Sequence, residues 1–373
     1  MMSILFETYL QWVQRALWGK ADDVLAKPDD ATLAALVPLC AEQATGPLVF
    51  PSLLTSGLLP EGSTLRMQMK AVCAQTMQQQ VKLRHTLGMA WQALTEAGIK
   101  PVLMKGAGLA ALYSDASQRA WSDIDLFVGK EQYHPSCAVL RDTFPKALKF
   151  DEELDHYKHY NLIADGVSIE IHRVTAALPH PIDDRRYARM EAYAVAHACE
   201  QEIEGLKVKV LEPTFNALFV FLHAWEHMQT RGACVRQLCD IALVLHHYAE
   251  QIDRKRLKRY LEALHLMDIW HVYMYALVRY IGLAEPEAPF YSEAYATRAE
   301  RLMTDLLQGE GVEKNVTEKS PANRWLRKIH TMQERLHDAQ RIRPYSASYA
   351  RHTNAGILLR GALRLFAKDR HWE

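Results

Sequence analysis

The chain has 373 residues, of which 49% are hydrophobic and 24% are charged, and its formal net charge is zero. This balance excludes a disordered chain, which combines low hydrophobicity with high net charge, and it disfavours a protein that coats nucleic acid. No stretch approaches the roughly 18 uninterrupted apolar residues of a membrane helix. The N-terminal segment 1–20 is amphipathic and lacks the apolar core of a signal peptide, so we expect a cytoplasmic protein with no membrane partner.

Helices are expected throughout the first 98 residues. Segment 66–97 lacks proline and carries apolar residues at helical spacing, and Gly98 is a suitable stop for it. The pattern then becomes mixed. The elements expected next, in chain order, are a short strand at 99–104, a turn and helix at 105–113, a half-buried strand at 122–128 and a helix at 131–143.

A β-hairpin is expected around Asp165-Gly166, because two alternating runs flank this dipeptide. A further strand is expected at 206–213, and helices from Pro213 onward. We therefore expect an α+β protein in three parts: an N-terminal helical region (1–98), an α/β core (99–212) and a C-terminal helical domain (213–373). The last part ends in a basic tail, since residues 320–373 contain eleven Lys or Arg and four Asp or Glu.

Three acidic side chains stand out in the expected core. Asp123 and Asp125 are two apart on a strand, so both point to the same face. Glu170 and His172 likewise share one face of the second hairpin strand. If these strands are neighbours, three carboxylates converge, and such a group needs a cation to offset the repulsion of like charges. Mg²⁺ held by carboxylates and substrate phosphates fits this pattern, and a two-metal site is one form of it.

A phosphate-binding segment is expected just before these carboxylates. Lys105 and Gly106 lie where a strand ends and a helix begins, and exposed amides at a helix N-terminus favour a phosphate. Arg119 can neutralise phosphate charge. The simpler interpretations are a solvated Lys105 at a strand end and a surface ion pair of Arg119 with Asp115 or Asp123.

The run from Leu103 to Val128, LMKGAGLAALYSDASQRAWSDIDLFV, resembles the nucleotidyltransferase superfamily with the DNA polymerase beta-like fold. It is most similar to the uncharacterised bacterial nucleotidyltransferase family, whose members show a strand, Lys-Gly and then Arg-x-x-Ser-Asp-Ile-Asp. The resemblance covers about residues 90–240 and implies a nucleotidyltransferase-type mixed sheet. One departure is Ala107, because the broader superfamily has a serine after the glycine.

The resemblance implies a role for each matching residue. Asp123 and Asp125 correspond to the metal-binding Asp-x-Asp, and Glu170 to the third carboxylate, which binds metal or deprotonates the acceptor hydroxyl. The nucleotide- and phosphate-binding residues it implies are Lys105, Gly106, Arg119 and Ser122. The implied reaction transfers a nucleoside monophosphate from a nucleoside triphosphate such as ATP to an acceptor hydroxyl, with Mg²⁺ as cofactor.

A second set of polar residues lies on the helices that follow. His223 and His227 sit four apart in His-Ala-Trp-Glu-His, a sequence that matches the inverted zinc-protease motif H-x-x-E-H. The third protein ligand that zinc catalysis needs has no signature downstream. Family members carry a similar His-x-x-x-His helix and then Arg-x-x-x-Asp, here Arg236 and Asp240. These residues and His172 are candidates for lining the cleft, or for structural packing.

Three functions remain open from the sequence. The first is the Mg²⁺-dependent nucleotidyltransferase, with an acceptor that can be a small metabolite, an antibiotic, a sugar, a protein side chain or an RNA end. The second is a non-catalytic nucleotide- or RNA-binding regulator on the same fold, which uses the basic tail. The third is a zinc hydrolase centred on His223 and His227.

Overall fold

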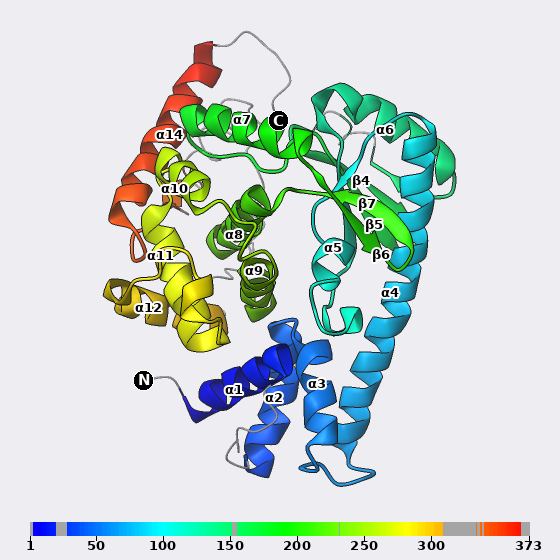
Figure 1. Cartoon of the computed structure of the whole chain (residues 1–373), viewed down its shortest axis with the longest axis vertical. Helices are drawn as coiled ribbons and strands as arrows, with labels where there is room; N and C mark the ends of the chain where they lie inside the picture. Colours follow the sequence, from blue (N-terminus) through cyan, green and yellow to red (C-terminus); the bar gives the residue numbers. More distant parts are fainter. Residues whose placement is uncertain are drawn as a thin grey trace.

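The computed structural model describes residues 3–19, 28–150, 154, 156–230, 232–308, 333, 336–337 and 339–366. A mixed β-sheet lies beside the long helix α4, and most of the other helices gather on the opposite side of the sheet (Figure 1). The expected combination of a mixed sheet with flanking helices is confirmed.

The described part of the chain begins with four helices, and capping marks both ends of the longest. The longest, α4, begins after Ser63, whose hydroxyl accepts a hydrogen bond from the Arg66 amide. It ends before Gly98, which has φ +75°. The expected helix at 66–97 is therefore confirmed. The bounds are α1 Ile4–Trp18, α2 Asp30–Glu42, α3 Gly46–Thr55 and α4 Thr64–Glu96.

The sheet has seven strands in the order β3-β4-β5-β2-β1-β7-β6. The pairs β2–β5 and β1–β7 are parallel, and the other neighbours are antiparallel. The strand bounds are β1 Val102–Leu103, β2 Asp123–Phe127, β3 Leu148–Lys149, β4 His159–Ala164, β5 Val167–His172, β6 Cys199–Ile203 and β7 Leu206–Val210.

Two hairpins turn on residues in the left-handed region. Asp165 (φ 49°) and Gly166 (φ 80°) join β4 to β5, as the Asp-Gly signal predicts. Glu204 (φ 48°) and Gly205 (φ 85°) join β6 to β7. Strand β6 has no clear signal in the sequence. Its residues, Cys-Glu-Gln-Glu-Ile, lie at the sheet edge and lack an alternation of polar and apolar side chains. The expected strand at 206–213 is too long, since β7 ends at Val210 and α8 begins at Pro213.

One face of the sheet is apolar and is covered by α4 and α6 (Gly129–Thr143). Leu87 and Trp91 of α4 and Tyr133 of α6 pack in one cluster with Ile124 and Ile169 of the sheet. Each of these residues is at least nine-tenths buried. The other face of β2 and β5 is therefore free to carry polar groups toward the C-terminal helices.

Short elements and one further helix complete the core region. They are α5 Ala107–Ala110, the 3₁₀ turn η1 Ala116–Gln118 and α7 Pro181–Ala196. Helix α7 was not anticipated. Its first residue is Pro181, and its N-cap is His180, whose ring accepts a hydrogen bond from the Ile182 amide.

The C-terminal part is helical, as expected. Its elements are α8 Pro213–Thr230, α9 Val235–His247, α10 Arg254–Ala263, α11 Met267–Ala276, the π-helical turn η3 Leu277–Ile281, the 3₁₀ turns η4 Glu285–Glu287 and η5 Glu293–Tyr295, α12 Ala296–Gln308 and α14 Ala347–Phe366. None of the described helices combines the length and the apolar character needed to span a bilayer.

The N-terminal helices α1 to α3 share one apolar core with these C-terminal helices. Side chains of α1 also reach the backbone of η3: the Gln14 amide donates to the Tyr280 carbonyl at 3.0 Å, and the Trp18 indole donates to the Ile281 carbonyl at 2.7 Å. In the basic tail, Tyr345 and Tyr349 are buried in this core. Segments 309–332 and 367–373 of the C-terminal part lie outside the described residues.

Candidate active site

The register of two parallel strands brings the acidic residues together. Asp125 of β2 lies opposite Glu170 of β5, and Phe127 lies opposite His172. Carboxylate oxygens of Asp123, Asp125 and Glu170 all lie within 4.8 Å of one another. The expected convergence of three carboxylates on one face of the sheet is therefore present in the structure.

Two basic side chains hold the central carboxylate. The Lys105 Nζ lies 2.9 Å from Asp125 Oδ1, and the same oxygen lies 3.1 Å from His172 Nε2. The His172 Nε2 also lies 3.1 Å from Glu170 Oε2, so one ring bridges the carboxylates of both strands. Lys105 is therefore not a solvated strand-end lysine: its side chain is only 13% exposed, and its partner is fully buried.

These contacts shift the ionisation of every group in the cluster. Burial alone would raise the pKa of Asp125, but the charges of Lys105 and His172 bring it well below its ordinary value. The negative charge of Asp125, followed by burial, raises the pKa of Asp123. Burial opposes the charged forms of Lys105 and His172, but the surrounding carboxylates outweigh it and raise both pKa values. The cluster therefore favours positive charge beside Asp125.

The donor set fits a divalent cation. Asp125 Oδ2 is buried and has no hydrogen-bond partner in the described part of the chain, although Oδ1 of the same carboxylate has two. A buried carboxylate oxygen without a partner costs free energy unless a cation or donor reaches it. Three oxygen donors are the ligand chemistry of Mg²⁺. Asp123, Asp125 and Glu170 are thus the residues that could hold the ion.

The loop before α5 depends on a glycine. Gly106 has φ +56° and ψ −117°, a conformation that residues with a side chain rarely adopt. A Cβ at this position would lie 3.0 Å from the Trp121 ring and 3.2 Å from the Asp123 carbonyl oxygen. The loop therefore passes directly against the strand that carries the Asp-x-Asp pair.

The structure gives Arg119 a different partner from the ones expected. Its side chain is 4% exposed and forms two hydrogen bonds with Asp240, from Nε at 2.7 Å and from Nη2 at 2.9 Å. Its Nη1 donates to the Gly106 carbonyl at 3.2 Å. The expectation of a surface ion pair with Asp115 or Asp123 is wrong, because Asp240 approaches from α9, which is remote in sequence. Arg119 ties α9 to the glycine loop.

Asp240 is the centre of this buried network. The Tyr113 hydroxyl donates to its Oδ1 at 2.9 Å, and Arg236 reaches its Oδ2 at 3.1 Å, as the four-residue spacing of Arg236 and Asp240 predicts. The charge of Asp240 outweighs the effect of burial and raises the pKa of Arg119. The network is a structural link between the helical part and the site.

His159 belongs to the carboxylate cluster but is not among the residues expected from the sequence. It lies opposite His172 on β4, with ring centroids 5.0 Å apart, and its ligand atom groups with those of Glu170 and His172. Burial lowers the pKa of His159 to about 4, so its ring is neutral at pH 7. A two-residue turn at Asp165-Gly166 forces this pairing, so the hairpin signal alone could have found it.

The paired histidines of α8 lie near the same charges. The rings of His223 and His227 are 4.5 Å apart in an edge-to-face arrangement. Burial, and then the positive charge of Lys105, lowers the pKa of His223 well below its ordinary value. Neither histidine belongs to a group of three converging metal-ligand atoms among the described residues. Ser122 is exposed at the start of β2.

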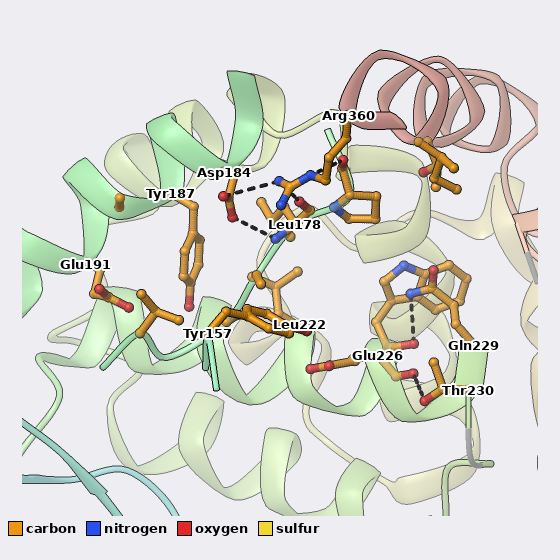
Figure 2. A pocket seen from close by; sticks show the side chains of 18 of the residues that line it. Tyr157, Leu178, Asp184, Tyr187, Glu191, Leu222, Glu226, Gln229, Thr230 and Arg360 are labelled. Atoms are coloured by element: carbon orange, nitrogen blue, oxygen red, sulfur yellow. Dashed lines mark hydrogen bonds and ion pairs between the residues drawn. The ribbon is translucent and has the colours of Figure 1, made fainter. Parts of the chain in front are cut away.

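A cavity of about 490 Å³ lies between α7, α8 and α14 (Figure 2). Figure 2 shows Tyr187 and Glu191 on one wall, Leu222 and Glu226 below, and Arg360 above. No side chain of the carboxylate cluster lines the cavity, and the two are linked through neighbours along the chain. Arg173, which lines the cavity, follows His172 at the end of β5, and Glu226 lies one helical turn after His223 on α8.

With this geometry established, comparison with known proteins identifies the family. A family model described as uncharacterised nucleotidyltransferase matches residues 29–282. The chain belongs to this family. The resemblance found in the sequence is thereby confirmed, and the match extends beyond the sheet into the helices on both sides.

Other known proteins resemble this chain only weakly. A crystal structure of an antigenic nucleotidyltransferase-like protein from Paracoccidioides brasiliensis is similar, with 17% sequence identity and a TM-score of 0.32. The similarity covers 56% of this chain and 95% of that one. A search of curated proteins gave no significant match.

Replacing Gly106 with alanine should disturb the site. Holding alanine at positive φ costs about 1–3 kcal/mol, and its Cβ must push against Trp121 and the Asp123 backbone. We expect a matching loss in the free energy of unfolding, measured with urea. The control is Gly108→Ala, whose Cβ would meet only ordinary contacts at 3.6 Å. Equal stability of the two variants would contradict this account.

Replacing Asp240 with asparagine should destabilise the fold. The change leaves the buried Arg119 guanidinium without its counterion. Removing one partner of a buried ion pair lowers the free energy of unfolding by about 3–5 kcal/mol. The control is Glu262→Gln, because its pair with Lys258 is exposed and contributes at most about 1 kcal/mol. Chemical denaturation of both variants measures the difference, and a small loss for Asp240→Asn would show that the network does not hold the helices to the site.

Proposed function

We propose that the protein is a Mg²⁺-dependent nucleotidyltransferase that transfers a nucleoside monophosphate from a nucleoside triphosphate to an acceptor hydroxyl. One observation carries this proposal: three carboxylates from two neighbouring strands converge, and the buried Oδ2 of the central one has no partner among the described residues. Membership of a nucleotidyltransferase family supports it.

In this proposal Asp123, Asp125 and Glu170 hold the metal. When bound, Mg²⁺ supplies positive charge for the triphosphate and for the leaving pyrophosphate. The His172 ring, which contacts Asp125 and Glu170, fixes the orientation of both carboxylates. The Glu170 side chain is 23% exposed, and in this proposal it either completes the metal site or accepts the proton of the acceptor hydroxyl. Catalysis then rests on positioning and charge neutralisation.

The residues proposed for phosphate binding have two kinds of role: some contact the nucleotide, and one holds the glycine loop in position. Gly106 lets the backbone of its loop approach a phosphate closely. Lys105 pairs with Asp125 at 2.9 Å, and its ammonium would be available to the triphosphate if a divalent ion took its place on that carboxylate. Arg119 acts as a positioning residue, because its guanidinium is committed to Asp240 and the Gly106 carbonyl. Ser122 is exposed beside Asp123 and can contact the nucleotide.

The cavity in Figure 2 is the place we propose for the acceptor. It lies one turn of α8 beyond His223, which is itself within electrostatic reach of Lys105 and Asp125. Its wall combines aromatic rings such as Tyr157 and Tyr187 with charged groups such as Glu226. A hydroxylated small molecule of moderate size fits such a mixed surface better than a long polymer does.

Two other functions fit the structure less well. A non-catalytic nucleotide-binding regulator would keep the fold and the family, and it predicts nucleotide binding without pyrophosphate release. A zinc hydrolase at His223 and His227 needs a third converging ligand, and none is present among the residues that the structure describes.

Removing the metal ligands tests the proposal. The double variant Asp123→Asn/Asp125→Asn should lower Mg²⁺-dependent pyrophosphate release from nucleoside triphosphates by at least about 100-fold, since it removes preorganised charge from the site. The assay uses labelled triphosphates with a metabolite extract as the source of acceptor. Nucleotide binding by a wild-type protein that releases no pyrophosphate would favour the regulator instead.

A matched control exists in the β4–β5 hairpin, whose second strand pairs with β2. Asp165→Asn makes the same chemical change at an exposed turn residue with φ 49°, a conformation that asparagine also adopts. This variant should release pyrophosphate at the wild-type rate. Unchanged turnover in the Asp123/Asp125 double variant, with Asp165→Asn as reference, would rule the mechanism out.

Filling the cavity tests the acceptor site. Ala188 is an exposed residue of α7 that lines the cavity, so Ala188→Trp should narrow it without disturbing the core. We expect the extract-dependent pyrophosphate release to fall and the KM for the triphosphate to stay the same. Ala192→Trp is the control, since Ala192 is exposed on the same helix but does not line the cavity. Equal activity of the two variants would place the acceptor elsewhere.

A further inference from the structure

A second group of metal-ligand atoms lies outside the proposed active site. Ligand atoms of His180, Asp183 and His352 all lie within 4.8 Å of one another. His180 and Asp183 are the cap and the third residue of α7, and His352 comes from α14, 169 residues after Asp183. The group therefore joins two helices that are far apart in the sequence.

The rings and the carboxylate are closely packed. The His180 and His352 rings stack with centroids 4.3 Å apart and planes 16° apart. The His352 Nε2 lies 2.5 Å from Asp183 Oδ2, and Asp183 is 3% exposed. A third imidazole, that of His265 after α10, contacts the other side of His352 with its centroid 4.0 Å away.

The backbone is built to hold this arrangement. A Cβ at Gly356, one turn after His352 on α14, would lie 2.5 Å from the His180 Cα, so only glycine permits this approach. Arg360, one turn further, donates to the carbonyls of Leu178 at 2.8 Å and Pro179 at 3.2 Å and pairs with Asp184 (Figure 2). These contacts fix the loop that leads into His180.

The cap of α7 selects the ligand atom of His180. The His180 Nδ1 accepts a hydrogen bond from the Ile182 amide, so Nε2 is the ring nitrogen that remains for a metal ion. A neutral imidazole binds a metal ion through such a nitrogen.

We propose that His180, Asp183 and His352 form a Zn²⁺ site that joins α14 to α7. Two imidazoles and a carboxylate are a ligand set that zinc prefers, with bonds of about 2.0–2.2 Å. Tetrahedral ligands at that bond length are about 3.3 Å apart, so the His352–Asp183 contact must lengthen by less than 1 Å. Because an imidazole binds a metal ion in the plane of its ring, the His180 ring must also turn out of its stack on His352. Arg186 pairs with Asp183 Oδ1 at 3.2 Å, so Oδ2 is the ligand atom of that carboxylate. A water molecule would take the fourth position.

The site has a consequence for the cavity in Figure 2. Asp184 and Tyr187 of α7 line that cavity, and so do Tyr349, Thr353 and Arg360 of α14. A metal that fastens α14 to α7 therefore fixes one wall of the cavity. This inference does not depend on the proposed nucleotidyltransfer, because the three ligands lie outside the carboxylate cluster.

Zinc binding is measured on untagged, EDTA-stripped protein titrated with ZnCl₂ by calorimetry and elemental analysis. The Asp123→Asn/Asp125→Asn variant is the background, so that the acidic cluster does not contribute. We expect one zinc equivalent per chain and a rise in Tm of about 5 °C, because the ion binds only the folded state. Zinc should also slow amide hydrogen exchange in α14. Failure of this background protein to bind zinc would overturn the proposal.

Three substitutions in this background locate the ion. His352→Gln keeps a side-chain N–H that can donate to Asp183, and His180→Ser keeps a helix cap, but each removes a preferred zinc ligand. Both should lose the zinc equivalent and the zinc-dependent rise in Tm while remaining folded. His85→Ala, at an exposed histidine of α4, should retain both. Zinc uptake by His352→Gln and His180→Ser equal to that of the background protein would identify an adventitious surface site and overturn the proposal.

Discussion

The pairing of β2 with β5 is the constraint on which the site depends. Because the two strands run parallel and Asp125 lies opposite Glu170, their polar residues meet on one face while Ile124 and Ile169 enter the core on the other. A shift of one residue would exchange the two faces of a strand and bury its carboxylates under α4. The apolar packing against α4 and α6 therefore selects the register that concentrates negative charge.

That concentration explains why the surrounding residues are basic or neutral. Lys105 and His172 offset the charge of Asp125 directly. The second buried network follows the same logic, since Asp240 is neutralised by Arg119 and Arg236. Both of these buried acids thus have cationic partners, as the cost of burying an isolated charge requires. The two networks meet at the Gly106 loop, whose carbonyl Arg119 binds and whose neighbour Lys105 contacts Asp125.

Much of the fold, and the carboxylate cluster, could be predicted because their signals are local. Period-two alternation located β2, β4 and β5, Asp-Gly located the β4–β5 hairpin, and the i, i+2 rule placed each pair of polar residues on one face. The partner of Arg119 could not be predicted, because Asp240 lies 121 residues away. The same holds for His180, Asp183 and His352, since helix packing alone brings α14 to α7. Strand β6 could not be predicted, because an exposed edge strand needs no alternation of polar and apolar residues.

The core shared by the first and the later helices bears on the order in which the molecule can fold. Gln14 and Trp18 bind carbonyls of Tyr280 and Ile281, more than 260 residues downstream, and the apolar faces of α1 to α3 are buried in the same cluster. During synthesis these apolar faces are made before the C-terminal helices that bury them. Until those helices are made, the faces are exposed to solvent or bound by a chaperone. Contacts so distant in sequence slow folding. An excised segment 99–212 would lack both α4, which covers the apolar face of its sheet, and the helices beyond the polar face, so the proposed activity belongs to the longer chain.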